Sequence, residues 1–242
     1  MQVLVCDNVS PKGVATLEAR PELQVTVVDG GLTDELLANA EAIVVRSATK
    51  ITPEVMDKAP KLRAVGRAGV GVDNVDVDYV TSKGIVVMNT PAGNTISTAE
   101  LTFSMMMALA RNIPQAHLSM KGGKWDRKKY GGTELSGKTL GICGMGRIGG
   151  QVARRAIAFG MRVLAYDPFL SLSKARELQV ELLELDELME RADFITVHMP
   201  LTDKTRDMIN AESIARMKDG VFLVNCARGG IINETDIVAA CL

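Results

Sequence analysis

Short apolar runs rich in β-branched residues alternate with segments of helical periodicity along the whole chain. Apolar runs of this length fit strands that are buried on both faces of a parallel sheet. In the N-terminal part they predict strands at Val3–Cys6, Gln24–Val28, Ala42–Val45, Leu62–Val65 and Ile85–Met88. The segments between them predict helices at Pro11–Arg20, Thr33–Ala40 and Pro53–Ala59. This alternation is typical of a parallel α/β sheet.

The C-terminal part shows the same alternation a second time. Its predicted strands are Thr139–Cys143, Arg162–Tyr166, Val180–Leu183, Phe194–Val197 and Val221–Asn225. Its predicted helices are Arg147–Phe159, Ser173–Leu178, Asp186–Arg191, Ala211–Met217 and Glu234–Leu242. We therefore expect two Rossmann-like or flavodoxin-like domains, residues 1–95 and 96–242, with an active-site cleft between them.

The segment between the two sheets predicts one long helix and one loop. Ser97 and Glu100 have the spacing of a capping box, and an apolar helix follows them to about Arg111. The three consecutive methionines Met105–Met107 fit core or subunit-interface packing better than metal binding, since no ligand partners accompany them. The Gly- and Lys-rich stretch Lys121–Gly132 is typical of an exposed loop.

Composition narrows the class of protein. The 242 residues are 47% hydrophobic and 24% charged, with a net charge of -1, so no basic surface indicates a nucleic-acid partner. No apolar run approaches the ~20 residues that span a bilayer, and the N-terminus lacks the pattern of a signal peptide. The four cysteines form no CxxC pair, which disfavours a zinc site or a disulfide framework. A reducing cytoplasm is the simplest location.

One glycine motif has the context of a dinucleotide site. Gly144, Gly146 and Gly149 join the predicted strand Thr139–Cys143 to a helix, and Asp167 ends the next strand. In such motifs the first glycine permits the tight turn, the second permits close approach of the pyrophosphate, and the third permits close helix packing. The helix N-terminus offers free N–H groups to the phosphates.

The carboxylate at the end of the second strand indicates which dinucleotide binds. Asp167 can accept hydrogen bonds from the ribose hydroxyls and would repel a 2′-phosphate, and Pro168 and Phe169 offer no arginine to bind one. The motif therefore predicts NAD rather than NADP as the cofactor.

A second glycine cluster, Gly66–Gly71, also follows a predicted strand. It lacks the strand and acidic residue that complete a dinucleotide motif. Two interpretations stay open: a backbone N–H loop around Gly69 and Gly71 that binds a small anion, and a purely structural turn.

Taken together, these motifs resemble the D-isomer-specific 2-hydroxyacid dehydrogenases. The resemblance is carried by Gly144–Gly149 with Asp167, Thr196–Pro200, and Val224–Gly230. Further segments resemble the branch of this family that acts on D-3-phosphoglycerate: Val45–Thr49, Gly66–Asp73, Met88–Pro91 with Asn94, and Lys124–Lys129. The resemblance covers nearly the whole chain. It implies NAD-linked oxidation of D-3-phosphoglycerate to 3-phosphohydroxypyruvate, the first step of serine biosynthesis.

The resemblance also implies roles for single residues. It makes Arg228 the catalytic residue that grips the substrate carboxylate and steers the carbonyl, a task suited to a bidentate guanidinium. Beyond the glycine motif and Asp167, it assigns cofactor contacts to Val70, Arg147, Ile148, Met199, Cys226, Ala227 and Arg228. It assigns substrate contacts to Arg46, Ser47, Gly69, Val70, Gly71, Asn94 and Arg127, the last reaching a neighbouring subunit. No metal is implied.

The proton-transfer pair of this family does not match any residue of the chain. The family's histidine and carboxylate come later in its sequences than Gly230, whereas His117 and His198 lie earlier and Glu234 starts a predicted helix too soon. The last strands of the NAD domain and a helix that returns to the first domain are also missing. We therefore expect the chain to be a fragment, or the visible part of a longer polypeptide, and inactive by itself.

Two other functions fit the same motifs. One is a dehydrogenase for another 2-hydroxy acid, of the glyoxylate, hydroxypyruvate or D-lactate type. The other is a non-catalytic NAD-binding module like the dehydrogenase-related transcriptional corepressors. As partners we expect a small phosphorylated 2-hydroxy acid and a second copy of the chain, in a homodimer or homotetramer formed through the NAD domain, with no nucleic acid and no membrane.

Overall fold

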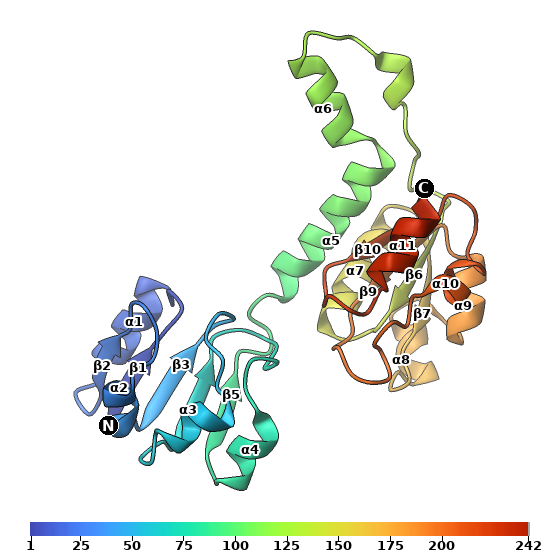
Figure 1. Cartoon of the computed structure of the whole chain (residues 1–242). Coiled ribbons are helices and arrows are strands. Elements are labelled where there is room, and N and C mark those ends of the chain that lie inside the picture. The colour runs from blue at the N-terminus through green and yellow to red at the C-terminus, as the bar shows by residue number, and fades with distance from the viewer. Residues whose placement is uncertain (242) are drawn as a thin grey trace. The chain divides into compact units, whose positions relative to one another are not determined.

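The computed structural model describes residues 1–241 and divides the chain into two compact units. Unit 1 is Met1–Asn94, and unit 2 starts at Thr95. Each unit is built on a five-stranded sheet in which every strand pair is parallel. Figure 1 shows both sheets with their helices. The prediction of a parallel α/β architecture is therefore confirmed.

Unit 1 has the strand order β2-β1-β3-β4-β5. Its strands are β1 (Gln2–Val5), β2 (Gln24–Val27), β3 (Ala42–Val45), β4 (Ala64–Arg67) and β5 (Val86–Asn89). Its helices are α1 (Pro11–Glu18), α2 (Asp34–Asn39), α3 (Pro53–Asp57) and α4 (Val77–Ser82). Leu4, Ile43 and Val65 on the inner strands are fully buried, because helices cover both faces of a doubly wound sheet.

Unit 2 has the strand order β10-β9-β6-β7-β8. Its strands are β6 (Thr139–Cys143), β7 (Arg162–Tyr166), β8 (Glu181–Leu182), β9 (Phe194–Val197) and β10 (Phe222–Asn225). Its helices are α5 (Thr95–Ala110), α6 (Ile113–Lys121), α7 (Arg147–Ala158), α8 (Leu172–Glu177), α9 (Leu185–Arg191), α10 (Ala211–Ile214) and α11 (Glu234–Cys241), with a 3₁₀ turn η1 (Arg127–Tyr130). Leu242, the last residue of the predicted final helix, lies outside the described residues.

The long helix α5 begins two residues before its predicted cap. Because α5 starts at Thr95, Ser97 and Glu100 lie within the helix, and the predicted capping box is wrong. The buried face of α5 includes Phe103 and Met106, so the methionine run serves core packing in part. The exposed fraction of Met105 is 40%, which leaves this methionine at the surface.

Two helices and one turn were not predicted. Helix α4 in unit 1 begins with a side-chain cap from Asp76. Helix α6 has no buried residue, and η1 lies in the stretch that the sequence suggested was a loop. In Figure 1, α6 and η1 form an arm beyond the end of α5. Among residues 1–241, no helix combines the length and the apolar character needed to cross a bilayer.

Candidate functional site

The turn after β6 has the geometry that only glycine allows at two positions. Gly144 has φ +97°, and a Cβ added there would lie 2.8 Å from the carbonyl oxygen of His198. A Cβ on Gly149 would lie 2.0 Å from the carbonyl oxygen of Gly144. The first glycine makes the turn and the third brings α7 against it, as the motif predicted.

The middle glycine faces open space. Gly146 is the N-cap of α7, is exposed, and a Cβ added to it would meet no atom within 4 Å. Because glycine has no side chain, no N-cap side chain accepts hydrogen bonds from the amide N–H groups in the first turn of α7. The positive end of the helix therefore presents donors to open space, which fits a phosphate ligand.

Asp167 holds this turn in place. Its Oδ2 accepts a hydrogen bond from the Met145 N–H at 2.8 Å, and its Oδ1 accepts one from the Phe169 N–H at 2.8 Å. Each carboxylate oxygen has a second lone pair, so the predicted acceptance of ribose hydroxyls is compatible with both bonds. Asp167 thus braces the glycine turn at the position where the motif places the ribose.

The strand order puts this turn at a topological switch point. The strand β6 lies between β7 and β9, so chain connections leave it in opposite directions. Open α/β sheets bind ligands in the crevice at such a point, beyond the carboxyl ends of the strands. The segment after β9 lies beside this turn, since the side chain of Met199 and the carbonyl of His198 would be the nearest neighbours of a Cβ added to Gly144.

His198 is not suited to be a base at neutral pH. Its Nε2 lies 3.0 Å from the Thr196 hydroxyl, and its Nδ1 is buried with no partner. Burial lowers the pKa of His198 to about 4, so the ring is neutral near pH 7. A base with so low a pKa takes up a proton poorly at that pH.

The loop after β10 is closed by an asparagine that was not predicted to be a site residue. The Asn225 side chain accepts a hydrogen bond from the Ala227 N–H at 2.9 Å and donates one to the Arg228 carbonyl at 2.8 Å. Arg228 Nη1 donates to the Ala227 carbonyl at 2.8 Å. Asn225 therefore fixes the backbone that carries the predicted catalytic arginine. Its signal in the sequence was its position, since Asn at the end of a strand favours such side-chain turns.

Other predicted cofactor residues of unit 2 lie at this same edge. Arg147 and Ile148 start α7, while Cys226 and Ala227 follow β10. Cys226 Sγ lies 3.5 Å from the sulfur of Met105, which joins the β10 loop to α5. Arg127 lies apart from this edge, in the exposed turn η1 on the arm.

Unit 1 brings a second group of predicted residues to the carboxyl edge of its own sheet. Arg46 and Ser47 follow β3, Gly69–Gly71 follow β4, and Asn94 lies beyond β5. The last two loops are tied together, because Gly69 accepts a hydrogen bond from the Thr90 N–H at 2.9 Å and Val70 accepts one from the Asn89 side chain at 2.7 Å.

Arg67, which was not among the predicted site residues, lies against two residues that were, Ser47 and Gly69. Its guanidinium donates to the Ser47 hydroxyl at 2.9 Å and lies so close over Gly69 that an added Cβ would be 1.3 Å from Nη1. The Arg67 Nε is buried with no partner. Two cationic residues, Arg46 and Arg67, thus lie at the carboxyl edge of the sheet of unit 1. The signal was the arginine inside the cluster Gly66–Gly71, which was considered only for its glycines.

Comparison with known proteins identifies the family. Residues 103–241, more than half of the chain, match the family model described as D-isomer specific 2-hydroxyacid dehydrogenase, NAD binding domain. The chain belongs to the D-isomer-specific 2-hydroxyacid dehydrogenases. The predictions of the family and of NAD as the cofactor are confirmed, and the glycine turn with Asp167 lies inside the matched NAD-binding domain.

The chain is similar to curated proteins over almost its whole length. It is 51% identical over 245 residues to D-3-phosphoglycerate dehydrogenase of Methanocaldococcus jannaschii, a match that covers 99% of this chain and 46% of the relative. It is 48% identical to D-3-phosphoglycerate dehydrogenase of Bacillus subtilis, with coverage of 99% and 46%. The chain therefore spans less than half the length of these curated relatives.

Two solved structures with NAD bound have the same fold as this chain. A D-lactate dehydrogenase from Aquifex aeolicus complexed with NAD and lactic acid matches with a TM-score of 0.90 and 35% identity, over 99% of this chain and 73% of that one. An NAD-dependent formate dehydrogenase from Staphylococcus aureus in complex with NAD matches with a TM-score of 0.87 and 29% identity, over 99% and 77%.

Proposed function

We propose that this dehydrogenase oxidises D-3-phosphoglycerate to 3-phosphohydroxypyruvate with NAD, the first step of serine biosynthesis. The observation that carries the proposal is the identity of about one half, over 99% of the chain, with D-3-phosphoglycerate dehydrogenases from an archaeon and a bacterium. The solved D-lactate dehydrogenase from Aquifex aeolicus is less similar, at 35%.

The residues of unit 2 fit the cofactor. The uncapped start of α7 and the open space at Gly146 suit the pyrophosphate, and Asp167 suits the adenosine ribose. When bound, NAD supplies the acceptor for the hydride that leaves C2 of the substrate. Met199, Cys226 and Ala227 lie at the same edge of the sheet and line the cofactor site in this proposal.

Arg228 binds the substrate carboxylate in this mechanism. A planar guanidinium can hold a carboxylate through two parallel hydrogen bonds, which fixes the position of C2. The Asn225 side chain and the bond from Arg228 Nη1 to the Ala227 carbonyl hold this arginine in a defined place. A positioned cation next to the reacting carbon also stabilises negative charge that develops on the C2 oxygen.

The edge of unit 1 suits the other end of the substrate. Arg46 and Arg67 supply positive charge, and the backbone of Gly69–Gly71 supplies N–H groups. Phosphate groups are bound well by arginine and by backbone amides of glycine-rich loops. Arg127 contributes to the phosphate site of a neighbouring subunit in this proposal.

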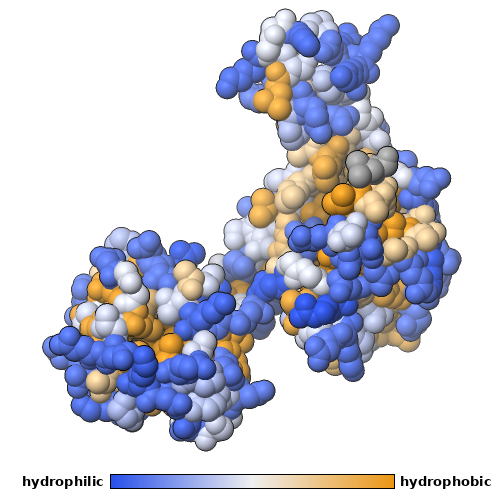
Figure 2. Space-filling model, in the orientation of Figure 1, coloured by the Kyte–Doolittle hydropathy of each residue, from blue (hydrophilic) through white to orange (hydrophobic). Residues whose placement is uncertain are grey.

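The proposed assembly is a homodimer or homotetramer formed through unit 2. Leu101, Met105 and Leu109 on α5 and Ile113 at the start of α6 are exposed. Figure 2 shows apolar surface along the second half of α5. A contiguous apolar surface of this kind is typical of subunit contacts. The free thiols of Cys6, Cys143, Cys226 and Cys241 fit a cytoplasmic location.

A spectrophotometric assay tests the proposed reaction. The whole protein should form NADH from D-3-phosphoglycerate with a kcat/KM at least about 100-fold higher than from D-lactate, because a lost charged contact lowers transition-state binding by a factor of this order. Replacing NAD by NADP should lower the rate with D-3-phosphoglycerate. Equal or faster oxidation of D-lactate would contradict the proposed substrate, and so would the absence of any oxidation of D-3-phosphoglycerate.

A further inference from the structure

The loop Arg46–Thr49 carries two of the proposed substrate ligands but has little apolar anchorage of its own. Arg46, Ser47 and Ala48 are exposed, and Thr49 is half-buried. A loop with so few buried contacts keeps one conformation only if hydrogen bonds hold it. Arg67 donates to the Ser47 hydroxyl, and the side chains of Asp7 and Asn74 bond the loop at its two ends.

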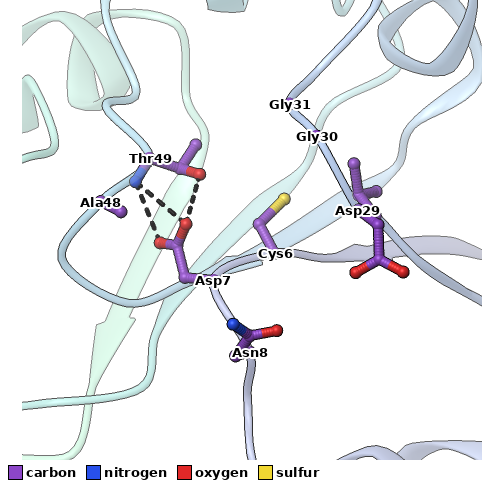
Figure 3. A pocket seen from close by; sticks show the side chains of 9 residues that line it. Cys6, Asp7, Asn8, Asp29, Gly30, Gly31, Ala48 and Thr49 are labelled. Carbon is purple, nitrogen blue, oxygen red and sulfur yellow. Dashed lines mark hydrogen bonds between the residues drawn. The ribbon is translucent and has the colours of Figure 1, made fainter.

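Asp7, directly after β1, holds the loop from one side. Its Oδ2 accepts hydrogen bonds from the Arg46 N–H at 2.7 Å and the Thr49 N–H at 3.0 Å. Its Oδ1 accepts one from the Thr49 hydroxyl at 2.6 Å. Figure 3 shows the carboxylate turned toward Thr49, at one side of a cavity of about 290 Å³.

The backbone and the charge of Asp7 both suit this task. Asp7 has φ 63° and Asn8 has φ 50°, an unusual left-handed pair that turns the chain sharply after β1. Burial by itself raises the pKa of Asp7, but the bonds from Thr49, Arg46 and Ala48 outweigh it and leave the pKa below its ordinary value. The carboxylate is therefore ionised at neutral pH, and charged acceptors form the stronger hydrogen bonds.

Asn74, between β4 and α4, holds the same loop from the other side. Its Nδ2 donates to the Arg46 carbonyl at 2.8 Å and to the Thr49 carbonyl at 2.6 Å. The Asn74 carbonyl accepts a hydrogen bond from the Ile51 N–H at 2.8 Å, just beyond the loop. Asp7 thus accepts hydrogen bonds from the N–H groups of Arg46 and Thr49, and Asn74 donates hydrogen bonds to the carbonyls of the same two residues.

We propose that Asp7 and Asn74 are positioning residues that pre-order the loop Arg46–Thr49 for the substrate's anionic group. The proposal rests on the proposed function, in which Arg46 and Ser47 bind the substrate. Ordering a loop costs conformational entropy, and binding is weaker when the ligand must order it. Neither side chain contacts the substrate in this account, since both are directed at the loop backbone.

The test compares Asp7→Asn with Asp29→Asn in the whole protein. Asp7→Asn keeps the shape of the side chain but puts an N–H donor where an acceptor is needed. It should raise KM for D-3-phosphoglycerate about 10-fold, leave kcat within about 2-fold, and leave the Kd of NAD unchanged. Asp29 lines the same cavity but is exposed, and in Figure 3 its carboxylate points away from Thr49, so Asp29→Asn should change none of these values.

Hydrogen exchange supplies a readout that does not depend on catalysis. In the substrate-free protein, the Arg46 and Thr49 amides should exchange at least about 10-fold faster in Asp7→Asn than in Asp29→Asn. Should Asp7→Asn fail to fold, Thr49→Val removes only the hydroxyl bond, and Thr49→Ser should restore it. The KM values of Thr49→Val and Thr49→Ser for D-3-phosphoglycerate are then compared with that of Asp29→Asn.

The two readouts separate this inference from the proposed function. If the wild-type protein oxidises a different 2-hydroxy acid, the proposed substrate is wrong, and the KM comparison is made with that acid. Unchanged exchange at Arg46 and Thr49 overturns the positioning role of Asp7. Faster exchange with an unchanged KM overturns the link between loop order and substrate binding.

Discussion

At the scale of single residues, His198 couples the stability of unit 2 to pH. Its folded pKa of about 4 lies below the ordinary value near 6.5, because burial disfavours the charged ring. Above pH 6.5 the His198 ring is mostly neutral in both the folded and the unfolded protein. Between pH 6.5 and pH 4 the unfolded chain takes up a proton that the folded protein does not, so stability falls as the pH is lowered.

The size of this effect is measurable with one variant. We expect the free energy of unfolding of the wild type to fall between pH 7 and pH 4 by on the order of 3 kcal/mol more than that of His198→Gln, which cannot take up a proton. Urea titrations at a series of pH values would measure the difference. Parallel pH profiles for the two proteins would show that the ring is not buried in its neutral form.

The residue scale also shows which parts of the site could be predicted. The turn geometry of Gly144 and Gly149 was predictable because it depends on local chain geometry within one strand–turn–helix unit, whereas the cofactor role of Asp167 stays a prediction. The contact of Arg67 with Ser47 and the bonds of Asp7 to Arg46 and Thr49 join residues 20, 39 and 42 positions apart. No local pattern encodes such pairs, because they arise only when neighbouring strands bring their loops to one edge.

At the scale of elements, burial explains which predictions held. The strands β6, β7 and β9 were predicted with their observed ends, since most of their residues are apolar and buried in the sheet. The strands β4 and β5 lie further along the chain than predicted, and β4 ends in a polar arginine. Helix α6 was missed because it has no buried face, so its sequence shows no clear apolar stripe.

Two adjacent glycines test the packing of α7 against the turn. A Cβ on Gly149 would meet the Gly144 carbonyl oxygen at 2.0 Å, whereas a Cβ on Gly150 would meet nothing within 4 Å. Gly149→Ala should therefore destabilise the protein by about 2–4 kcal/mol and weaken NAD binding, because backbone must move. Gly150→Ala should stabilise it by about 0.5–1 kcal/mol, as alanine favours the helix.

Thermal unfolding and NAD titration would measure both variants side by side. The pair controls for the effect of an added methyl group in the first turn of the same helix. Equal stabilities, or tight NAD binding by Gly149→Ala, would mean that close contact between α7 and the turn is not required.

At the scale of the whole molecule, each unit places its chemistry at the carboxyl ends of its parallel strands. Unit 2 offers a turn suited to a dinucleotide and the loop of Arg228, while unit 1 offers Arg46 and Arg67. One end of a phosphorylated 2-hydroxy acid is a carboxylate and the other is a phosphate. The proposed function assigns the carboxylate to Arg228 and the phosphate to the arginines of unit 1 and to Arg127.

The phosphate selectivity tests this central claim most directly. D-glycerate has the carboxylate and the hydroxyl of D-3-phosphoglycerate and lacks only the phosphate. We predict that the whole protein oxidises D-3-phosphoglycerate with NAD at a kcat/KM at least about 100-fold higher than D-glycerate, because charged contacts to the phosphate contribute several kcal/mol. Similar kcat/KM values for the two acids would contradict the account.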